Sequence, residues 1–280
     1  MSELGSGAHE VGVRVVTEGL GGAEDAVLRI TIDRPDRNGA LGLAQQYAFV
    51  AALEEASTSD TVRVIVIDSV GDHFCAGADV VAANASIEGD SKPRPGSLQR
   101  RTPLQAHRII ELLHQIQLPV VSVVRGWAAG LGCEIALASD FAVAADSARF
   151  WLPFTKRGFT PDSGSTWLLP RLIGIARAKE MLMLGRPVTG ADAATWGMIY
   201  RSAPAEEIDT TAAALVAELA AAPTVALGLT KHCIHEALTS TLGAAMAAES
   251  MALELSSRTA DFREGIAAFS QRRDPRFEGR

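Results

Sequence analysis

Cysteine is scarce in this sequence, and its three residues, Cys75, Cys133 and Cys233, lie far apart. None belongs to a C-x-x-C pair, and their odd number argues against a disulfide or zinc framework and favours a reducing compartment. His232 and His235 form an H-x-x-H pattern but lack the glutamate of a zinc protease helix. The sequence therefore predicts no metal site.

An excess of positive charge is also missing, since 26 Lys and Arg residues stand against 33 Asp and Glu residues. The formal net charge of −7 argues against nucleic acid or an acidic membrane surface as a partner. A local basic cluster would still suit an anionic ligand. No apolar run reaches the ~18 residues of a membrane-spanning helix, and no signal peptide pattern is present. We therefore expect a cytoplasmic protein without a membrane partner.

Internal repeats at a solenoid period are absent. Apolar residues make up 48% of the 280, enough for one large core and an accessory region. We expect a flexible N-terminus over residues 1–10, a core domain over residues 11–200 and a C-terminal helical region over residues 201–280. The apolar positions of the last helices need another surface to cover them, either the core or a neighbouring subunit.

Short runs rich in β-branched residues predict strands at residues 11–16, 26–33, 62–67, 120–124 and 141–144. Residues 43–57 and 104–117 show helical periodicity. The buried face expected for the first of these helices comprises Leu43, Tyr47, Val50 and Leu53.

Glycines gather where the apolar run 120–124 passes into a helix, with Gly130 and Gly132 at the helix start. A helix start has unpaired N–H groups and a partial positive charge, and glycine lets a ligand approach the backbone. Glu134 follows Leu131 by three residues, on the same helical face. A free N–H and a carboxylate directed at one spot suit a developing oxyanion and a general base. The alternative is a close-packed helix start with an exposed glutamate.

A second loop of small residues, Ala76-Gly77-Ala78, follows the strand predicted at residues 62–67. Its backbone N–H groups can face the same spot, so that the two loops together form an oxyanion hole. The alternative is an ordinary tight turn.

Three other segments suggest ligand contacts. Arg34 and Arg37 lie beside a turn and suit a phosphate group, although solvated loop arginines show the same pattern. The apolar stretch 148–154 predicts either an acyl pocket or core. The polar loop over residues 82–103 is typical of a lid or a binding loop.

Thr160 and Pro161 predict a helix start, with the threonine as cap and the proline in the first turn. Asp162 then falls in that first turn. There it either complements the helix dipole or takes part in catalysis.

Taken together, four segments resemble the crotonase superfamily, also called the enoyl-CoA hydratase/isomerase family. The resemblance runs from about Val11 to the C-terminus, and in this order and spacing the segments are specific for the family. They are Ile30-Thr31-Ile32-Asp33-Arg34-Pro35, Phe74-Cys75-Ala76-Gly77-Ala78-Asp79, Gly126 to Glu134, and Asp261 to Phe269.

The resemblance implies an α/β fold, with a crotonase-like ββα spiral core and a C-terminal helical trimerisation region that builds trimers, often hexamers. It implies an acyl-CoA substrate whose carbonyl oxygen sits between the N–H groups of Ala78 and Leu131, although many members have glycine at the second position. Further CoA contacts are implied at Arg37, Ala76, Asp79, Phe269 and Arg272. Coenzyme A enters as part of the substrate, and no other cofactor is implied.

One position departs from the family pattern. Hydratases of the family use two glutamates to hold and split a water molecule, and Glu134 matches the first. The second aligns with Phe154, whose phenyl ring cannot deliver a proton. Asp162 matches the position at which dienoyl-CoA isomerases, ring-opening isomerases of phenylacetate breakdown and some dehalogenases carry an aspartate. The segment from Pro161 to Leu172 is most similar to the phenylacetate-type isomerases.

These observations favour an enzyme that isomerises an acyl-CoA through an enolate, with Glu134 and Asp162 as catalytic residues. Trp151 and Phe154 would shape the acyl pocket. The alternatives are an enoyl-CoA hydratase of β-oxidation that uses Glu134 with a substitute acid, a thioester hydrolase, and a non-catalytic CoA-binding or regulatory protein. A serine hydrolase is disfavoured because no G-x-S-x-G motif is present.

Overall fold

The computed structural model describes residues 11–19, 26–79, 94 and 96–280. The N-terminus over residues 1–10 and most of the predicted lid lie outside these residues. The end of that loop, which the structure does describe, forms the short helices α3 (Ser97–Arg101) and η3 (Thr102–Leu104).

The larger sheet has six strands in the order β1-β2-β3-β4-β6-β9. Only β1 and β2 pair antiparallel, and the remaining neighbours are parallel. The side chains of β3 and β4 are almost all buried, as expected for central parallel strands. The strands are β1 (Val13–Gly19), β2 (Ala26–Ile32), β3 (Val62–Ser69), β4 (Val120–Val124), β6 (Phe141–Ala145) and β9 (Arg201–Ala203).

A smaller sheet has the order β5-β7-β8, with β5 (Trp127–Ala129), β7 (Arg149–Trp151) and β8 (Val188–Thr189). Strand β5 pairs parallel with β7, and β7 pairs antiparallel with β8. Because β5 follows β4 and leads directly into α5 (Leu131–Ala138), this small sheet fixes where that helix begins.

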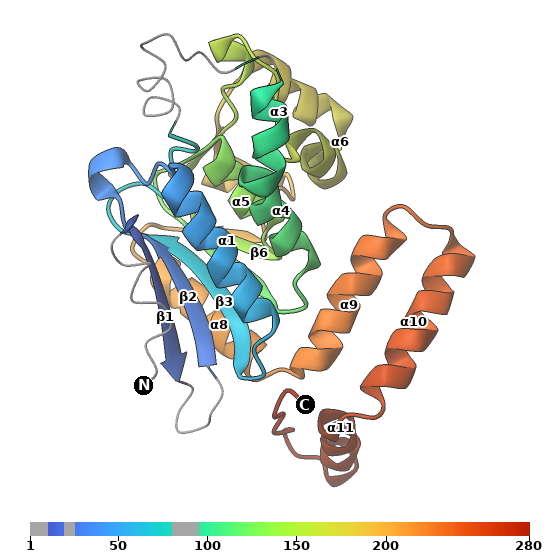
Figure 1. Ribbon diagram of the computed structural model, residues 1–280. Coiled ribbons are helices and arrows are strands. Elements are labelled where there is room, and N and C mark those ends of the chain that lie inside the picture. Colours follow the sequence, from blue (N-terminus) through green and yellow to red (C-terminus); the bar gives the residue numbers. More distant parts are fainter. Residues whose placement is uncertain (1–10, 20–25, 80–93, 95) are drawn as a thin grey trace.

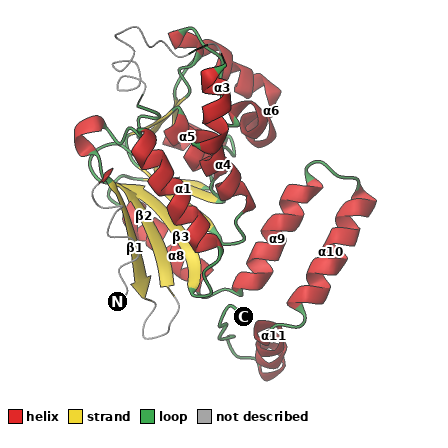
Figure 2. Cartoon of the chain, viewed as in Figure 1, coloured by secondary structure: helices red, strands yellow, loops and turns green. Residues whose placement is uncertain are grey.

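The other helices surround these sheets or extend from them. Helix α1 lies across one face of the larger sheet and α8 across the other, and α4 lies beside α1 (Figures 1 and 2). The bounds are α1 (Leu43–Ser57), α4 (Ala106–Gln115), α6 (Ser165–Leu184), α7 (Gly190–Thr195), α8 (Ile208–Ala220), α9 (Thr224–Ala237), α10 (Leu242–Ser256) and α11 (Ala260–Gln271), with 3-10 turns η2 (Pro35–Arg37) and η4 (Thr155–Arg157).

Helix α1 has the predicted bounds, but its buried face differs from the prediction. Val50 and Leu53 are buried as expected, whereas Leu43 and Tyr47 are 52% and 48% exposed. Phe49 is fully buried in their place. The buried surface is therefore rotated around the helix, because α1 packs against both the sheet and α4.

Helices α10 and α11 stand apart from the sheets in Figure 1, whereas α9 also contacts the core, since Lys231 Nζ lies 2.7 Å from Asp140 and Gly228 packs closely on Gln117. Residues 201–220 do not belong with them, because β9 pairs with β6 and α8 packs on β3, β4 and β6. The helices that extend from these sheets therefore begin with α9 at Thr224. In the described part of the chain, no single helix is long and apolar enough to cross a membrane, although the bent pair α8 and α9 meets that test jointly.

Candidate active site

Helix α5 starts at a constrained glycine. Gly130 is the residue before the helix and has φ 50° and ψ −124°, a conformation that favours glycine. Its N–H donates to the carbonyl oxygen of Trp151 in β7 (2.9 Å). The predicted strand-to-helix junction is therefore confirmed, with β5 inserted between β4 and the helix.

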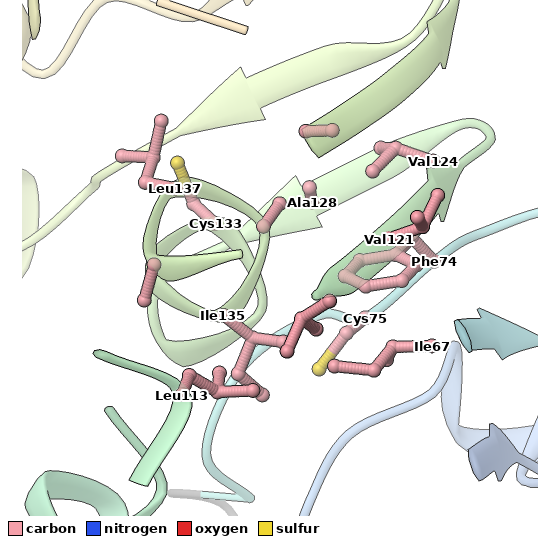
Figure 3. Packing of buried hydrophobic residues seen from close by; sticks show 14 of the residues in the cluster. Ile67, Phe74, Cys75, Leu113, Val121, Val124, Ala128, Cys133, Ile135 and Leu137 are labelled. Atoms are coloured by element: carbon pink, nitrogen blue, oxygen red, sulfur yellow. The ribbon is translucent and has the colours of Figure 1, made fainter. Parts of the chain in front are cut away.

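Gly132 has a packing role and not the predicted role of admitting a ligand. A Cβ atom at this position would lie 2.4 Å from the carbonyl oxygen of Cys75 and 2.5 Å from its Cβ. The missing side chain therefore lets α5 lie directly against the loop that contains Cys75. On other sides of the helix, Ile135 packs near Leu113 of α4 and Cys133 is fully buried (Figure 3).

The second loop lies beside the start of α5, as predicted. A Cβ atom on Gly77 would lie 2.7 Å from the carbonyl oxygen of Ala129 and 3.4 Å from the nitrogen of Leu131. The backbone on both sides of Ala78 is held by Leu41, which donates to the Gly77 oxygen (2.8 Å) and accepts from the Asp79 nitrogen (3.0 Å). The two loops are therefore fixed next to each other.

Two backbone donors at this junction have no acceptor. Neither the N–H of Ala78 nor that of Leu131 makes a hydrogen bond among the residues that the structure describes. Ala78 is exposed to solvent, whereas Leu131 is only 4% exposed. Unpaired N–H groups on adjacent loops can bind one oxygen atom that carries negative charge.

Glu134 is completely buried, so the alternative of an exposed glutamate is wrong. Neither carboxyl oxygen has a hydrogen-bond partner within the described residues. Burial raises the pKa of Glu134 well above its ordinary value, and the negative charge of Asp162 raises it further. The nearby hydroxyls of Ser165 and Ser163 oppose this shift.

Asp162 precedes α6 and does not lie in its first turn. The helix begins at Ser165, after Ser163 at φ 45° and Gly164 at φ 84°, and these two left-handed residues interrupt any helix from Thr160. The Asp162 carbonyl oxygen accepts from both the N–H and the hydroxyl of Ser165 (3.1 and 2.9 Å). This compact turn holds the backbone of Asp162, whose negative charge raises the pKa of Glu134.

The pKa of Asp162 is also raised, chiefly by burial. The Ser163 hydroxyl and the positive charge of His107 oppose the rise. Glu134 is fully buried, whereas Asp162 is exposed at the edge of the site, and the pKa values of both carboxyls are raised. Carboxyl groups with raised pKa values are candidates for proton transfer in catalysis.

Unpaired polar atoms concentrate around these carboxyls. Seven buried side-chain polar atoms are without an assigned hydrogen bond in the described part of the chain, although one of them, Arg14 Nε, is ion-paired with Asp33. Four of them are both carboxyl oxygens of Glu134, the hydroxyl oxygen of Ser163 and Nε2 of His107. Such groups mark a site that a ligand completes. The sequence analysis assigned no role to Ser163 or His107, because a lone histidine in a helix carries no pattern.

The two aromatic residues expected around the acyl group are held by different contacts. The Trp151 indole nitrogen donates to the carbonyl oxygen of Gly185 (2.9 Å), and its ring lies 5.5 Å from that of Trp127. Phe154 is 6% exposed and meets Phe159 edge to face at 5.5 Å. Both rings therefore have fixed positions, and their contact with an acyl group stays a prediction.

The expected CoA contacts near the second loop have different surroundings. Arg37 has an exposed side chain, with its Nε 3.8 Å from Asp36. Asp79 is nearly buried and lies 3.6 Å from Nη1 of Arg34, which donates to the Ala40 oxygen. Arg34 and Asp79 thus shape the loop, whereas the exposed Arg37 remains able to meet a phosphate.

Ala76, Phe269 and Arg272 complete the expected CoA contacts. The Ala76 N–H is already used, because it donates to the Asn38 oxygen (2.9 Å). Phe269 is 86% exposed on α11, and Arg272 ends that helix. Helix α11 stands away from α5 in Figure 1, so these two residues do not reach the junction of their own chain.

Possible metal ligands do not cluster among the residues described, where no three His, Cys, Asp or Glu side chains are grouped to hold an ion. The described groups at the junction include two unpaired backbone donors, the buried carboxyl of Glu134 and the more exposed carboxyl of Asp162.

The chain is similar to known proteins over nearly its whole length. The enoyl-CoA hydratase/isomerase family matches residues 22–280. The chain is 36% identical over 262 residues to 1,2-epoxyphenylacetyl-CoA isomerase of Escherichia coli (strain K12). This alignment covers 93% of the chain and 98% of that protein. It is 32% identical over 257 residues to 2,3-dehydroadipyl-CoA hydratase of the same strain, with 92% and 97% covered.

A solved enoyl-CoA hydratase from Polaromonas sp. JS666 has the same fold, with a TM-score of 0.86 at 30% identity over 95% of this chain and 99% of that one. The relatives are named for both isomerase and hydratase reactions. Together with the junction of two loops and a buried glutamate, these findings show that the chain belongs to the enoyl-CoA hydratase/isomerase family, the crotonase superfamily, and is an enzyme of that family.

Proposed function

We propose that this enzyme isomerises an enoyl-CoA thioester by moving its carbon–carbon double bond through an enolate intermediate. The observation that supports the proposal most is a fully buried carboxyl on Glu134, whose pKa the charge of the more exposed Asp162 raises, beside two unpaired N–H groups. No cofactor is needed beyond the coenzyme A of the substrate.

The N–H groups of Ala78 and Leu131 would bind the thioester carbonyl oxygen. A carboxylate removes the proton from C2 of a 3-enoyl thioester, and the electron pair moves onto this oxygen. Each donor of an oxyanion hole lowers such a barrier by about 3–4 kcal/mol. The proton then returns at C4, which leaves the double bond between C2 and C3.

Isomerisation is favoured over hydration because the carboxyl pair includes Asp162 and position 154 is a buried phenylalanine. Hydration needs a second group that holds water, and Phe154 cannot do this. A hydratase that uses Glu134 with Asp162 as the second acid is the alternative, consistent with the hydratases among the relatives.

For binding and assembly, we propose that Arg37 meets a phosphate of coenzyme A and that Phe269 and Arg272 reach the ligand from a neighbouring subunit. The reason is the placement of α11 away from the junction, with a strongly exposed phenyl ring. The exposed apolar side chains of α10 and α11 would then face other copies in a trimer or a dimer of trimers.

The test is to incubate the enzyme with a 2-enoyl-CoA and a 3-enoyl-CoA in heavy water and to identify the products by mass spectrometry. We expect a moved double bond and deuterium on carbon. Both should fall by about 10²–10⁴-fold in Asp162→Asn and in Glu134→Gln. A gain of one water that Asp162→Asn retains would replace this proposal with a hydratase.

A further inference from the structure

Residues 272–280, which we call the return segment, fold back onto the start of α11. Asp261 lies in the first turn of this helix and is 4% exposed. Its two carboxyl oxygens accept from the N–H groups of Glu278 (2.7 Å) and Gly279 (2.8 Å). Its own N–H donates to the carbonyl oxygen of Arg280 (3.1 Å). Hydrogen bonds to a carboxylate are strong, so Asp261 fixes the return segment to the beginning of α11.

Further contacts hold the return segment along the helix. The Glu264 carboxylate accepts from the guanidinium of Arg273 (2.6 and 2.8 Å) and from the N–H of Arg276 (2.7 Å). The ring of Phe277 lies 3.6 Å from the place of a Cβ atom on Gly265. The ion pair is exposed and contributes little by itself, whereas the buried Asp261 is the main attachment.

The other end of this connection is Arg63, a core residue of β3 that is 3% exposed. Its guanidinium donates to the carbonyl oxygen of Ala222 (2.6 Å) and to the hydroxyl of Thr224, where α8 gives way to α9. A Cβ atom on Gly279 would lie 2.7 Å from Arg63 Cζ, so the backbone of the return segment rests on the guanidinium. Figure 1 shows this end of the chain between α11 and the start of α9.

The direction of α11 depends on this connection. The helix packs little against the other described helices and strands, and its buried residues are Asp261 and Ala268. A helix without a broad contact is oriented by the chain at its two ends. The place of Phe269 and Arg272, at the far end of α11, is therefore determined by the contacts of Asp261 and Arg63.

We propose that Arg63 and Asp261 are positioning residues that set the direction of α11, so that Phe269 and Arg272 reach coenzyme A bound to a neighbouring subunit. This role rests on the shared ligand site proposed above. Arg63 lies near the start of β3, whereas the loop with the Ala78 N–H follows the other end of that strand. Its effect is therefore on ligand binding through α11 and not on proton transfer.

The first test compares Gly279→Ala with Gly197→Ala. Both glycines have a positive φ, 79° and 72°, so alanine has a similar backbone cost at the two positions. The added methyl group meets the Arg63 guanidinium at Gly279, whereas nothing lies within 4 Å at Gly197. Hydrogen exchange of residues 261–280, followed by mass spectrometry, should become faster in Gly279→Ala and stay unchanged in Gly197→Ala.

Asp261→Asn is the second variant, and it keeps the test possible if Gly279→Ala does not fold. The amide loses one of the two acceptors that hold the return segment. Asp274→Asn is its control, because Asp274 has an exposed side chain in the same segment. We expect the exchange of residues 261–280 to rise in the first variant and to match the wild type in the second.

Ligand binding gives the second measurement, with coenzyme A titrated by calorimetry and KM and kcat determined on an enoyl-CoA. Gly279→Ala should bind coenzyme A about tenfold more weakly, as when an interface loses one important contact. Its KM should rise by a similar factor, with kcat within about twofold of the wild type. A lower kcat with unchanged KM, or faster exchange with unchanged affinity, would overturn the positioning role.

Phe269→Ala separates this role from the shared ligand site. Wild-type affinity for coenzyme A in Phe269→Ala would overturn the shared site, whatever the return segment does. Weaker binding in Phe269→Ala but not in Gly279→Ala would overturn the positioning role alone. The affinity for coenzyme A does not depend on the reaction that follows, so hydration in place of isomerisation would leave the positioning role standing.

Discussion

The N–H of Leu131 is the donor that can be removed most selectively, because proline is tolerated at the first position of a helix. Leu131→Pro should fold and should lower turnover by about 10²–10³-fold, the cost of one oxyanion donor. Leu131→Ala is the matched control, since it loses the same buried side chain but keeps the N–H. Steady-state rates on one substrate test whether the N–H of Leu131 contributes to turnover. Equal rates in the two variants would exclude Leu131 from the oxyanion hole.

Glu134 also makes stability depend on pH, with a definite sign. The unfolded chain ionises this carboxyl at an ordinary pKa of 4.5, whereas the folded protein holds the proton to higher pH. The stabilising contribution is therefore complete below the unfolded value and is lost as the pH rises toward the folded one.

Urea denaturation of the wild type and of Glu134→Gln, at about pH 5 and about pH 8, should show this effect. The free energy of unfolding should fall less with rising pH in the variant. The same fall in both proteins would mean that Glu134 ionises normally in the folded state.

At the scale of elements, the contact between α5 and the Cys75 loop depends on one glycine. Gly132→Ala places a methyl group within 2.5 Å of Cys75 atoms, including a backbone oxygen, so the loop and the helix must separate. We expect a loss of about 1–3 kcal/mol in the free energy of unfolding, as for other overpacked sites.

Gly243 is the control for this substitution. It lies in α10, has an ordinary negative φ and has nothing within 4 Å of an added Cβ. Gly243→Ala should therefore be neutral or stabilising by up to ~1 kcal/mol, as expected from helix propensity. Urea denaturation of both variants measures the difference, and equal destabilisation would argue against close packing at Gly132.

The bounds of the helices were predicted from the sequence with unequal success. The periodicity of residues 43–57 predicted the bounds of α1, but not its buried face, since α1 packs against the sheet and α4 at once. The Thr160-Pro161 pattern predicted the helix start four residues too early, since the residue before the helix is Gly164 and not Thr160. There the two left-handed residues Ser163 and Gly164 override the local propensity.

At the scale of the whole molecule, the apolar side chains of the last helices should determine assembly. Leu242, Met251 and Leu255 of α10 are 78%, 66% and 55% exposed in the single chain. We expect the wild type to sediment at about three or six times its mass of 29.5 kDa, because burying these groups is favourable.

The double variant Met251→Glu, Leu255→Glu should sediment as a lighter species and bind coenzyme A more weakly, since Phe269 and Arg272 would then lack a neighbouring site. Val16→Glu changes an exposed apolar residue of β1 and should leave the mass unchanged. A wild type that sediments at the mass of one chain would contradict both the assembly and the shared ligand site.

The sequence by itself determined the family and the strand-to-helix junction and singled out Glu134 and Asp162 as candidate catalytic residues, because these inferences depend on short motifs that resemble the family. Local patterns also predicted most strands, since buried parallel strands need continuous apolar runs. Tertiary structure decided what is far apart in sequence: the meeting of the two loops and the burial of Glu134. Burial and charge coupling are properties of the packed molecule, and no local pattern of residues contains them.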